Sequence, residues 1–318
     1  MSIIEKSVLK TIVYYDSLDY PLTVEELELF SFRDSKDREV GNLIETVKGF
    51  YFLKDRENLV ELREKRNEIA KKKWQKTLKA VKWLQSVPYI RLAFASGSLA
   101  LNNTTKESDL DILIVAKAGR IWTARALAVA LLNFLGLLRR RDQAVAPDKV
   151  CLNHFITDKS LYIPRKSIYT AQLYARLVPI MGGDELVDNF CEANEWVGDY
   201  VRGWPGCIKN PNDKIQMTNK FQIPNSIFLN LIKRAGEKIL NSKFGDWVEG
   251  VLRKYQLRRI KSYHLTYKPG GRVKADDESL EFHPDSPELK IIERYNQTMI
   301  KLGFPELANE IDSGLTKT

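Results

Sequence analysis

Residues 94–117, FASGSLALNNTTKESDLDILIVAK, contain the most informative pattern in the chain. An apolar segment ends at Gly97-Ser98, and a second apolar segment begins with Asp109-Leu110-Asp111. The alternation of acidic and apolar residues is typical of a β-strand, in which successive side chains point to opposite faces. We therefore expect Asp109 and Asp111 to share one face at the start of a strand.

Two carboxylates on one face repel each other unless a cation lies between them. Hard oxygen ligands of this kind suit Mg²⁺ or Mn²⁺. Gly97 has no β-carbon, so a phosphate can approach its backbone, and the Ser98 hydroxyl can donate to a phosphate oxygen. The pattern predicts a site for a divalent metal and a nucleoside triphosphate, with in-line transfer of a nucleotidyl group as its chemistry.

The Gly-Ser pair followed by Asp-x-Asp within SDLDILIV resembles the signature of the DNA polymerase beta-like nucleotidyltransferase superfamily, over roughly residues 88–158. This resemblance implies metal-dependent nucleotidyl transfer. Asp109 and Asp111 would be the catalytic metal ligands, and Gly97 and Ser98 would bind the triphosphate. The family often has a basic residue soon after Gly-Ser, for which this chain offers only Lys106.

The third carboxylate of the family has no obvious counterpart. In KVCLNHFITD its place falls on Asn153, which can ligate a metal through its amide oxygen but cannot act as a base near neutral pH. Asp148 or Asp158 could take its place if the strand is shifted. His154 alternates with Asn153 and is expected to face the other side of the strand, in packing.

The segments around the motif predict an α+β fold. Strands are expected at YIRLAFASG, DLDILIVA and KVCLNHFI, with a helix at TARALAVALLNFLGLLRRR between the last two. The three arginines 139–141 are expected to end that helix, where cations are favourable. We divide the chain into a winged-helix-like domain (1–66), a nucleotidyltransferase core with a small mixed sheet (67–165) and a mainly helical C-terminal region (166–318), in which residues 264–284 form a β-hairpin or a mobile loop.

The N-terminal 66 residues predict three helices followed by a β-hairpin. Thr23 and Glu26 form a capping-box pattern at the start of the second helix. A third helix is expected to end near Gly49, with two strands around KDREN and with Phe50, Phe52 and Leu59 at apolar strand positions. This order of elements resembles a winged-helix domain.

The net charge of +9 is unevenly distributed. Residues 1–66 contain 11 Lys and Arg against 14 Asp and Glu, a net −3, whereas residues 67–180 contain 19 against 7, a net +12. A domain at −3 is not expected to bind DNA, because phosphate contacts require a basic face. In the helix predicted over residues 63–87, Ile69, Leu78, Val81 and Leu84 are expected inside. Lysines 71, 72, 73, 76 and 79 are expected outside, as a solvated face or a track for anionic substrates.

Other features exclude several classes of protein. The longest apolar run, residues 121–138, is interrupted by Arg125 and Asn133, so no membrane partner is expected, and the N-terminal charges Glu5 and Lys6 argue for a cytoplasmic protein. Three cysteines without a CxxC pair predict neither disulfides nor a thiolate zinc site. The three histidines lie far apart in sequence, which argues against a histidine-rich metal centre.

The leading hypothesis is a nucleotidyltransferase that uses Mg²⁺ or Mn²⁺ to move a nucleoside monophosphate from a triphosphate to an acceptor. The acceptor, whether a small molecule, a protein or RNA, is not identified by the sequence. The alternative is a catalytically inactive nucleotide- or RNA-binding module of the same fold, favoured by Asn153 and by the missing early basic residue. A DNA-binding regulator is a weaker third hypothesis.

Overall fold

A six-stranded mixed sheet forms the centre of the protein in a computed structural model, which describes residues 6–33, 43–140, 143, 145–209, 226–269 and 271–312. The strand order is β7-β4-β5-β6-β9-β8. Only β5 and β6 are parallel, and every other neighbouring pair is antiparallel. The strands are β4 (Ile90–Ala95), β5 (Leu110–Ala116), β6 (Val150–Thr157), β7 (Val178–Met181), β8 (Arg272–Ala275) and β9 (Ser279–His283). The prediction of an α+β fold with a mixed sheet is confirmed.

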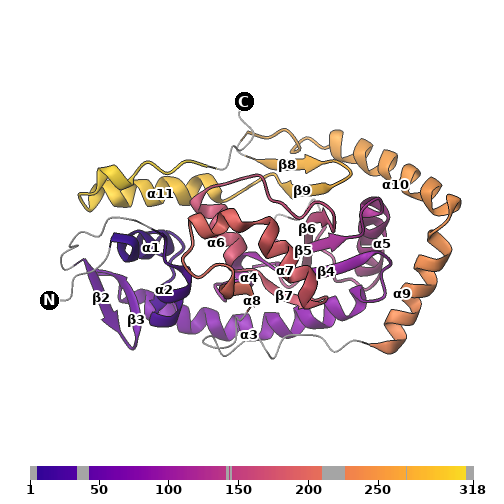
Figure 1. Ribbon diagram of the computed structural model, residues 1–318. Coiled ribbons are helices and arrows are strands. Elements are labelled where there is room, and N and C mark those ends of the chain that lie inside the picture. Colours follow the sequence, from indigo (N-terminus) through magenta and orange to yellow (C-terminus); the bar gives the residue numbers. More distant parts are fainter. Residues whose placement is uncertain are drawn as a thin grey trace.

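Both faces of this sheet are covered (Figure 1). Alternation along β4 and β5 sends Phe94 and Leu113 into one core and Ala93 and Ile112 into the other. The first core includes residues of α1 (Lys6–Asp16), α6 (Ile168–Ala175), α7 (Asp184–Ala193) and α11 (Glu288–Lys301). The second includes residues of α3 (Asn58–Leu84), α5 (Ile121–Phe134) and α10 (Lys243–Lys261). Asp111 lies on the face of the first core, so the N- and C-terminal helices enclose the motif.

Three of the six strands come from the segment after residue 165. Strand β7 pairs with β4, and the β8–β9 hairpin extends the sheet beyond β6. Of the two alternatives for residues 264–284, the structure has the β-hairpin, but the Gly-Gly pair between Tyr267 and Val273, where the sequence suggests the turn, comes before it. Its turn lies at residues 276–278, where Asp276 accepts backbone hydrogen bonds from Glu278 and Ser279, and Gly271 precedes β8.

The N-terminal region contains α1, α2 (Val24–Phe30) and a small sheet of β1 (Leu22–Thr23), β3 (Phe50–Leu53) and β2 (Ile44–Val47). The predicted capping box is present, because Thr23 accepts from the Glu26 amide and Glu26 accepts from the Thr23 amide. The prediction of a helix that ends near Gly49 is wrong for residues 43–49, which contain strand β2 and a turn. The earlier part of the predicted helix lies outside the described residues. Lys48 and Gly49 both have positive φ and form the β2–β3 turn, as two-residue hairpin turns require.

The hairpin therefore lies earlier than predicted. Leu59 belongs to α3 and not to a strand, and KDREN leads into this helix. The winged-helix resemblance of the whole N-terminal region stays a prediction.

Helix α3 runs along the second core for 27 residues. Val81 and Leu84 are buried as expected, whereas Ile69 and Leu78 are half-buried. The prediction that Lys73 belongs to an exposed lysine face is wrong, because only 2% of its side chain is exposed. The remaining elements are α4 (Gly97–Ala100), the 3-10 helix η1 (Glu195–Asp199), α8 (Gly206–Lys209), α9 (Ile227–Leu240) and the 3-10 helix η2 (Pro305–Leu307). None of the helices in the described ranges has the length and hydrophobicity needed to cross a membrane.

Candidate active site

Gly97 lies directly against the carboxylate of Asp111. Gly97 follows β4 with φ of +61°, and a β-carbon built at this position would lie 2.7 Å from Asp111 Oδ2. The Ser96 amide donates to the backbone carbonyl of Asp111 at 3.0 Å, which fixes the turn beside the start of β5. Glycine is thus required here both for its backbone conformation and for the space that its hydrogen leaves.

Asp109 and Asp111 form a compact group with Cys151 on the neighbouring strand. One ligand atom from each of the three lies within 4.8 Å of the others. Burial and, to a smaller extent, the adjacent Asp109 carboxylate together raise the pKa of Asp111 to about 7, against the opposing effect of Asn153 and Arg139. Burial likewise raises the pKa of the Cys151 thiol. The cluster thus resists a second negative charge, as expected of closely spaced carboxylates without a cation between them.

Arg139 contacts this cluster, which the sequence did not predict. Helix α5 ends at Phe134, five residues before Arg139, so the expectation that Arg139 ends the helix is wrong. The Arg139 amide instead donates to Val150 O at 2.9 Å, and its guanidinium donates to Asp109 Oδ2. Arg140 likewise lies beyond the helix, and Arg141 lies outside the described residues. The sequence gave no signal of the contact between Arg139 and Asp109. The contact forms because the chain between α5 and β6 runs back toward the start of β6, where Asp109 lies nearby.

Asn153 lies beside Asp111 in the folded chain. Its Nδ2 donates to Asp111 Oδ1 at 2.8 Å. The amide therefore supports the carboxylate through its donor group. Of the two alternatives, Asp158 lies at the opposite end of the β5–β6 pair, where it accepts from the Ala118 amide at 2.8 Å. Asp148 is held in ion pairs with Lys73 and Lys76.

The loop between Ser98 and Asp109 is held by the buried Lys73. Its Nζ donates to the carbonyls of Lys106 at 3.1 Å and of Ser108 at 2.6 Å, as well as to Asp148 at 3.0 Å. The Lys106 side chain is exposed and is not among those that line the cavity described next. Ser98 does line that cavity, and its carbonyl accepts from the Asn103 amide at 2.8 Å.

A cavity of about 370 Å³ adjoins the carboxylates. Its rim carries Ser96, Gly97, Ser98, Asp111 and Asn153. Its wall is largely aromatic and apolar and comes from distant parts of the chain, including Tyr14, Tyr15, Tyr169, Tyr174 and Ile291. This composition, a mostly apolar wall with a few convergent polar groups, is typical of a small-molecule site.

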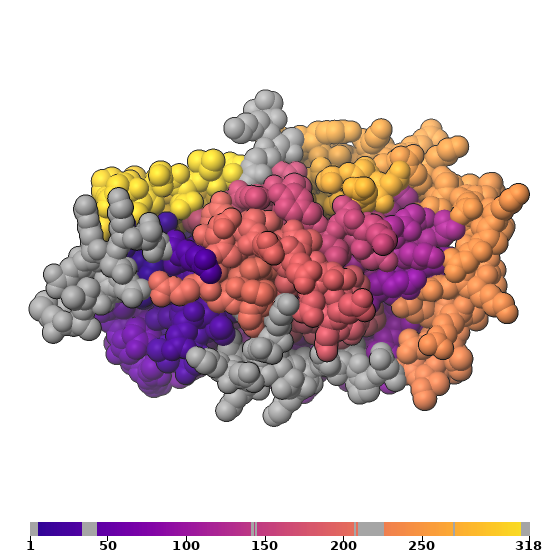
Figure 2. Space-filling view, in the orientation of Figure 1, coloured from indigo at the N-terminus to yellow at the C-terminus, as the bar shows by residue number. Residues whose placement is uncertain are grey.

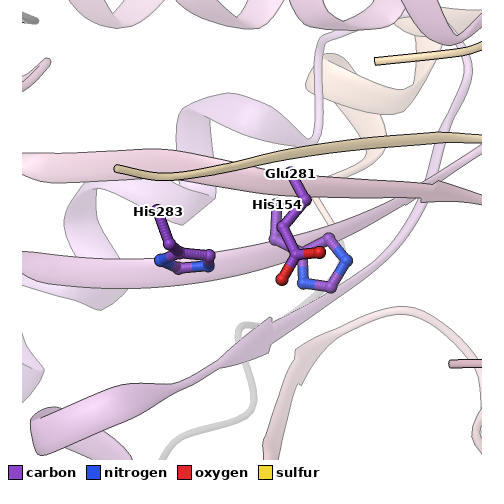
Figure 3. Close-up of side chains that lie close together, drawn as sticks. All are labelled: His154, Glu281 and His283. Atoms are coloured by element: carbon purple, nitrogen blue, oxygen red, sulfur yellow. The ribbon is translucent and has the colours of Figure 1, made fainter. Parts of the chain in front are cut away.

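His154 and His283 also line this cavity, and with Glu281 they form a second group of metal-ligating side chains (Figure 3). His154 was expected on the other face from Asn153. Both line the cavity because β6 is irregular here, with Cys151 to His154 opposite Asp111 to Leu113. Pairing of β6 with β9 brings together histidines that the sequence separates by more than a hundred residues.

Charge argues against a cation at this second group. Arg272 Nε lies 2.6 Å from Glu281 Oε1, and Arg165 Nε lies 3.7 Å from Oε2, so the carboxylate is already neutralised. Burial lowers the pKa of His154 to about 4 and that of His283 to about 3, so both rings are neutral at pH 7, and the positive charge that opposes a cation comes from the two arginines. We interpret the group as a polar wall of the cavity.

The Asp109–Asp111 pair, in contrast, fits a divalent cation. Its donors are oxygen atoms, and the raised Asp111 pKa reflects first the burial of the carboxylate and then repulsion from Asp109, which Arg139 offsets only in part and which a bound cation would offset further. Asp109 and Asp111 would be the ligands, and Asn153 would orient Asp111 or add its amide oxygen. The Cys151 thiol is a soft group that Mg²⁺ does not prefer.

Comparison with known proteins agrees with this geometry. Residues 74–153 match the family model of the nucleotidyltransferase domain, which covers 80 of the 318 residues. No curated protein and no solved structure matches the chain significantly. The matched segment contains the Gly97–Ser98 turn, both aspartates and Asn153. The family match supports the assignment of this part of the chain to the nucleotidyltransferase superfamily.

Proposed function

We propose that this protein is a metal-dependent nucleotidyltransferase that moves a nucleoside monophosphate from a nucleoside triphosphate to an acceptor. The observation that supports the proposal is the contact between Gly97 and the Asp111 carboxylate, within a segment that matches the nucleotidyltransferase domain, since the turn that would bind phosphate then lies beside an acid that would bind metal. Mg²⁺ or Mn²⁺ held by Asp109 and Asp111 would neutralise the triphosphate and polarise the phosphorus that is attacked.

The protein side chains would position the reactants. The Gly97 backbone and the Ser98 hydroxyl would hold phosphate oxygens, and Asn153 would keep Asp111 in one rotamer through its 2.8 Å hydrogen bond. The largely apolar cavity next to Asp111 would exclude water from the reacting groups. Lys106 would have to swing from its exposed position to assist at the triphosphate.

Label transfer tests the proposal. Each radiolabelled nucleoside triphosphate is incubated with the protein, Mg²⁺ or Mn²⁺ and cell extract, and labelled products are separated. The Asp109→Ala/Asp111→Ala variant should give none, whereas Asp158→Asn, an acid change at the far end of the same strand pair, should label like the parent. Equal labelling by the double variant would exclude the assignment.

One observation favours the alternative of a catalytically inactive nucleotide-binding module. The Arg139 guanidinium already neutralises Asp109, and the third position holds an amide that donates to Asp111. Such a site would bind nucleotide without turnover. Calorimetry with a non-hydrolysable triphosphate, combined with the labelling assay, separates the two functions: binding without any Asp111-dependent product supports the inactive module.

A further inference from the structure

Helix α9 is oriented with its apolar side away from the protein. Two of its charged residues face inward: Glu237 Oε1 accepts from Arg91 Nη1 and from the Tyr89 amide at 2.7 Å each, and Lys233 contacts the Ile90 carbonyl. Leu229 is buried and Leu240 packs against the second core, but five other large apolar residues are exposed, to 81% for Ile227, 69% for Phe228, 57% for Leu231, 44% for Ile232 and 64% for Ile239. An amphipathic helix normally buries the apolar side, so this reversal needs a partner.

Helix α10 continues the exposed apolar surface. Phe244, Trp247, Val251 and Tyr255 follow one another at spacings of three or four residues, and all are exposed, Trp247 to 64%. The rings of Phe244 and Trp247 stack with centroids 5.9 Å apart. The opposite side of the helix contacts α5, where Gln256 donates to Trp122 O at 2.9 Å. The outward face is therefore a second apolar stripe at helical spacing.

The charges of the two helices are segregated in the same way. Residues 227–261 contain nine Lys and Arg against three Asp and Glu. All three acids are engaged with the body of the protein: Glu237 with Arg91, Asp246 with Arg120, and Glu249 with the Trp122 and Thr123 amides. The outward side carries exposed basic residues, namely Arg234, Lys238, Lys243, Lys254, Arg258, Arg259 and Lys261.

We propose that the α9–α10 surface, defined as the exposed apolar and basic residues of these two helices, binds an anionic lipid bilayer. A helix that lies in a membrane interface buries Trp, Phe and Leu among the lipid chains and places Lys and Arg at the anionic headgroups. The two helices follow one another along one edge of the molecule, beyond α5 (Figures 1 and 2). The expectation of no membrane partner rested on spanning segments, whereas interfacial binding needs none.

The same residues argue against other occupants. A second copy would bring two basic surfaces face to face, which is unfavourable. Nucleic acid would pair with the basic residues and could stack on Trp247, but it offers nothing apolar to Leu231, Ile232 and Ile239. A lipid interface supplies both the negative charge and the apolar phase.

Vesicle co-sedimentation of the full chain tests the proposal. Phosphatidylcholine vesicles with and without phosphatidylglycerol are compared for the parent, Leu231→Ser/Ile232→Ser, Phe244→Ser/Trp247→Ser and Lys254→Glu/Arg258→Glu. All of these residues are exposed, so thermal unfolding should remain parental. Matched controls are Phe134→Ser, an apolar residue 87% exposed on α5, and Lys71→Glu/Lys72→Glu on the exposed side of α3.

The parent and both controls should bind anionic vesicles, and each α9–α10 variant should bind about tenfold more weakly or less. The absence of vesicle binding by the parent would overturn the proposal. The proposal would also be overturned if sedimentation velocity showed that the parent is a dimer and that Leu231→Ser/Ile232→Ser makes it a monomer. Binding to single-stranded RNA in place of vesicles, sensitive to Lys254→Glu/Arg258→Glu but not to the serine changes at Leu231 and Ile232, would overturn it as well.

Discussion

The α-carbon of Gly97 lies so close to the Asp111 carboxylate that an added β-carbon would lie 2.7 Å from Asp111 Oδ2. The contact joins the turn after β4 to the first residues of β5. It means that the position of a candidate metal ligand depends on the absence of a side chain fourteen residues earlier in the sequence.

Gly97→Ala should therefore impair the site more than it impairs the fold. The methyl group displaces the Asp111 carboxylate, and a displacement of about 1 Å can cost about 100-fold in rate. Gly119→Ala is the matched control, because Gly119 also has positive φ, +73°, but has no atom within 4 Å of the added carbon. Both variants should lose similar thermal stability, and only Gly97→Ala should lose label transfer. A similar loss of transfer in both would show that backbone strain alone is responsible.

Asn153→Asp should make stability depend on metal. The change replaces an amide that donates to Asp111 at 2.8 Å by a third carboxylate, and without metal we expect the repulsion to cost about 1–3 kcal/mol. Mg²⁺ or Mn²⁺ should recover this loss, so the midpoint of thermal unfolding should rise more on metal addition than in the parent, and any transferase activity should rise with it. Asn153→Ala, which removes the hydrogen bond without adding charge, should show no such gain. Equal metal shifts in parent and variant would remove Asn153 from the site.

Lys73→Met tests the support of the loop before the aspartates. The buried ammonium holds two loop carbonyls and Asp148, so its loss should destabilise the protein by about 1–3 kcal/mol and reduce label transfer. The neighbouring Lys72 is exposed, and Lys72→Met should change neither property. Urea unfolding followed by tryptophan fluorescence gives the free energies. Parental stability in Lys73→Met would show that the loop does not need this anchor.

Glu26 gives the clearest pH dependence. Although burial alone would raise its pKa, Arg63 and Arg176 lower the pKa of Glu26 to about 2, below the value of about 4.3 in an unfolded chain. The unfolded state therefore binds more protons between these values. The contribution of the ionised Glu26 carboxylate to the free energy of unfolding is fully present above about pH 5 and is lost as the pH falls toward 2.

Glu26→Gln should accordingly cost about 3–5 kcal/mol at pH 7, because it leaves two buried guanidinium groups without their carboxylate. The difference from the parent should shrink as pH falls from 5 to 3. Glu61→Gln removes an exposed acid paired with Lys65 and should have little effect at any pH. Urea midpoints measured across this pH range check both expectations, and a gap between parent and Glu26→Gln that stays constant with pH would contradict the assignment.

The motif segment could be predicted from sequence because its signals are local. Strands β4, β5 and β6 are mostly apolar, and the alternation at Asp109–Asp111 requires only the twofold period of a strand. The capping box at Thr23 is equally local. The β2–β3 hairpin was misplaced because residues 44–47 are half-buried or exposed and carry no strong alternation, so the preceding helical pattern was extended over them.

The rest of the site depends on contacts between distant segments. His154 lies near His283 only because β9 pairs with β6. The sequence of a five-residue strand such as β9 does not indicate which strand it pairs with. The bulge in β6 that turns both Asn153 and His154 to the cavity is invisible to a periodicity argument. Arg139 was assigned to the end of a helix and Lys73 to an exposed face, in each case together with the basic residues next to it in the sequence. Their partners, Asp109 and Asp148, become close only in the folded chain.

The cavity wall has a thermodynamic consequence. Tyr14 and Tyr15 come from the first helix, Ile291 from the last long helix, and Asp111 and Tyr174 from the middle of the chain. A molecule bound among them would contact α1, α11 and the central sheet at once, so its binding free energy would add to the unfolding free energy of the whole protein. A ligand present at 100 times its dissociation constant would contribute about 2.7 kcal/mol. Differential scanning fluorimetry of a metabolite collection, with triphosphate and Mg²⁺ present, would therefore detect the acceptor without any knowledge of the product.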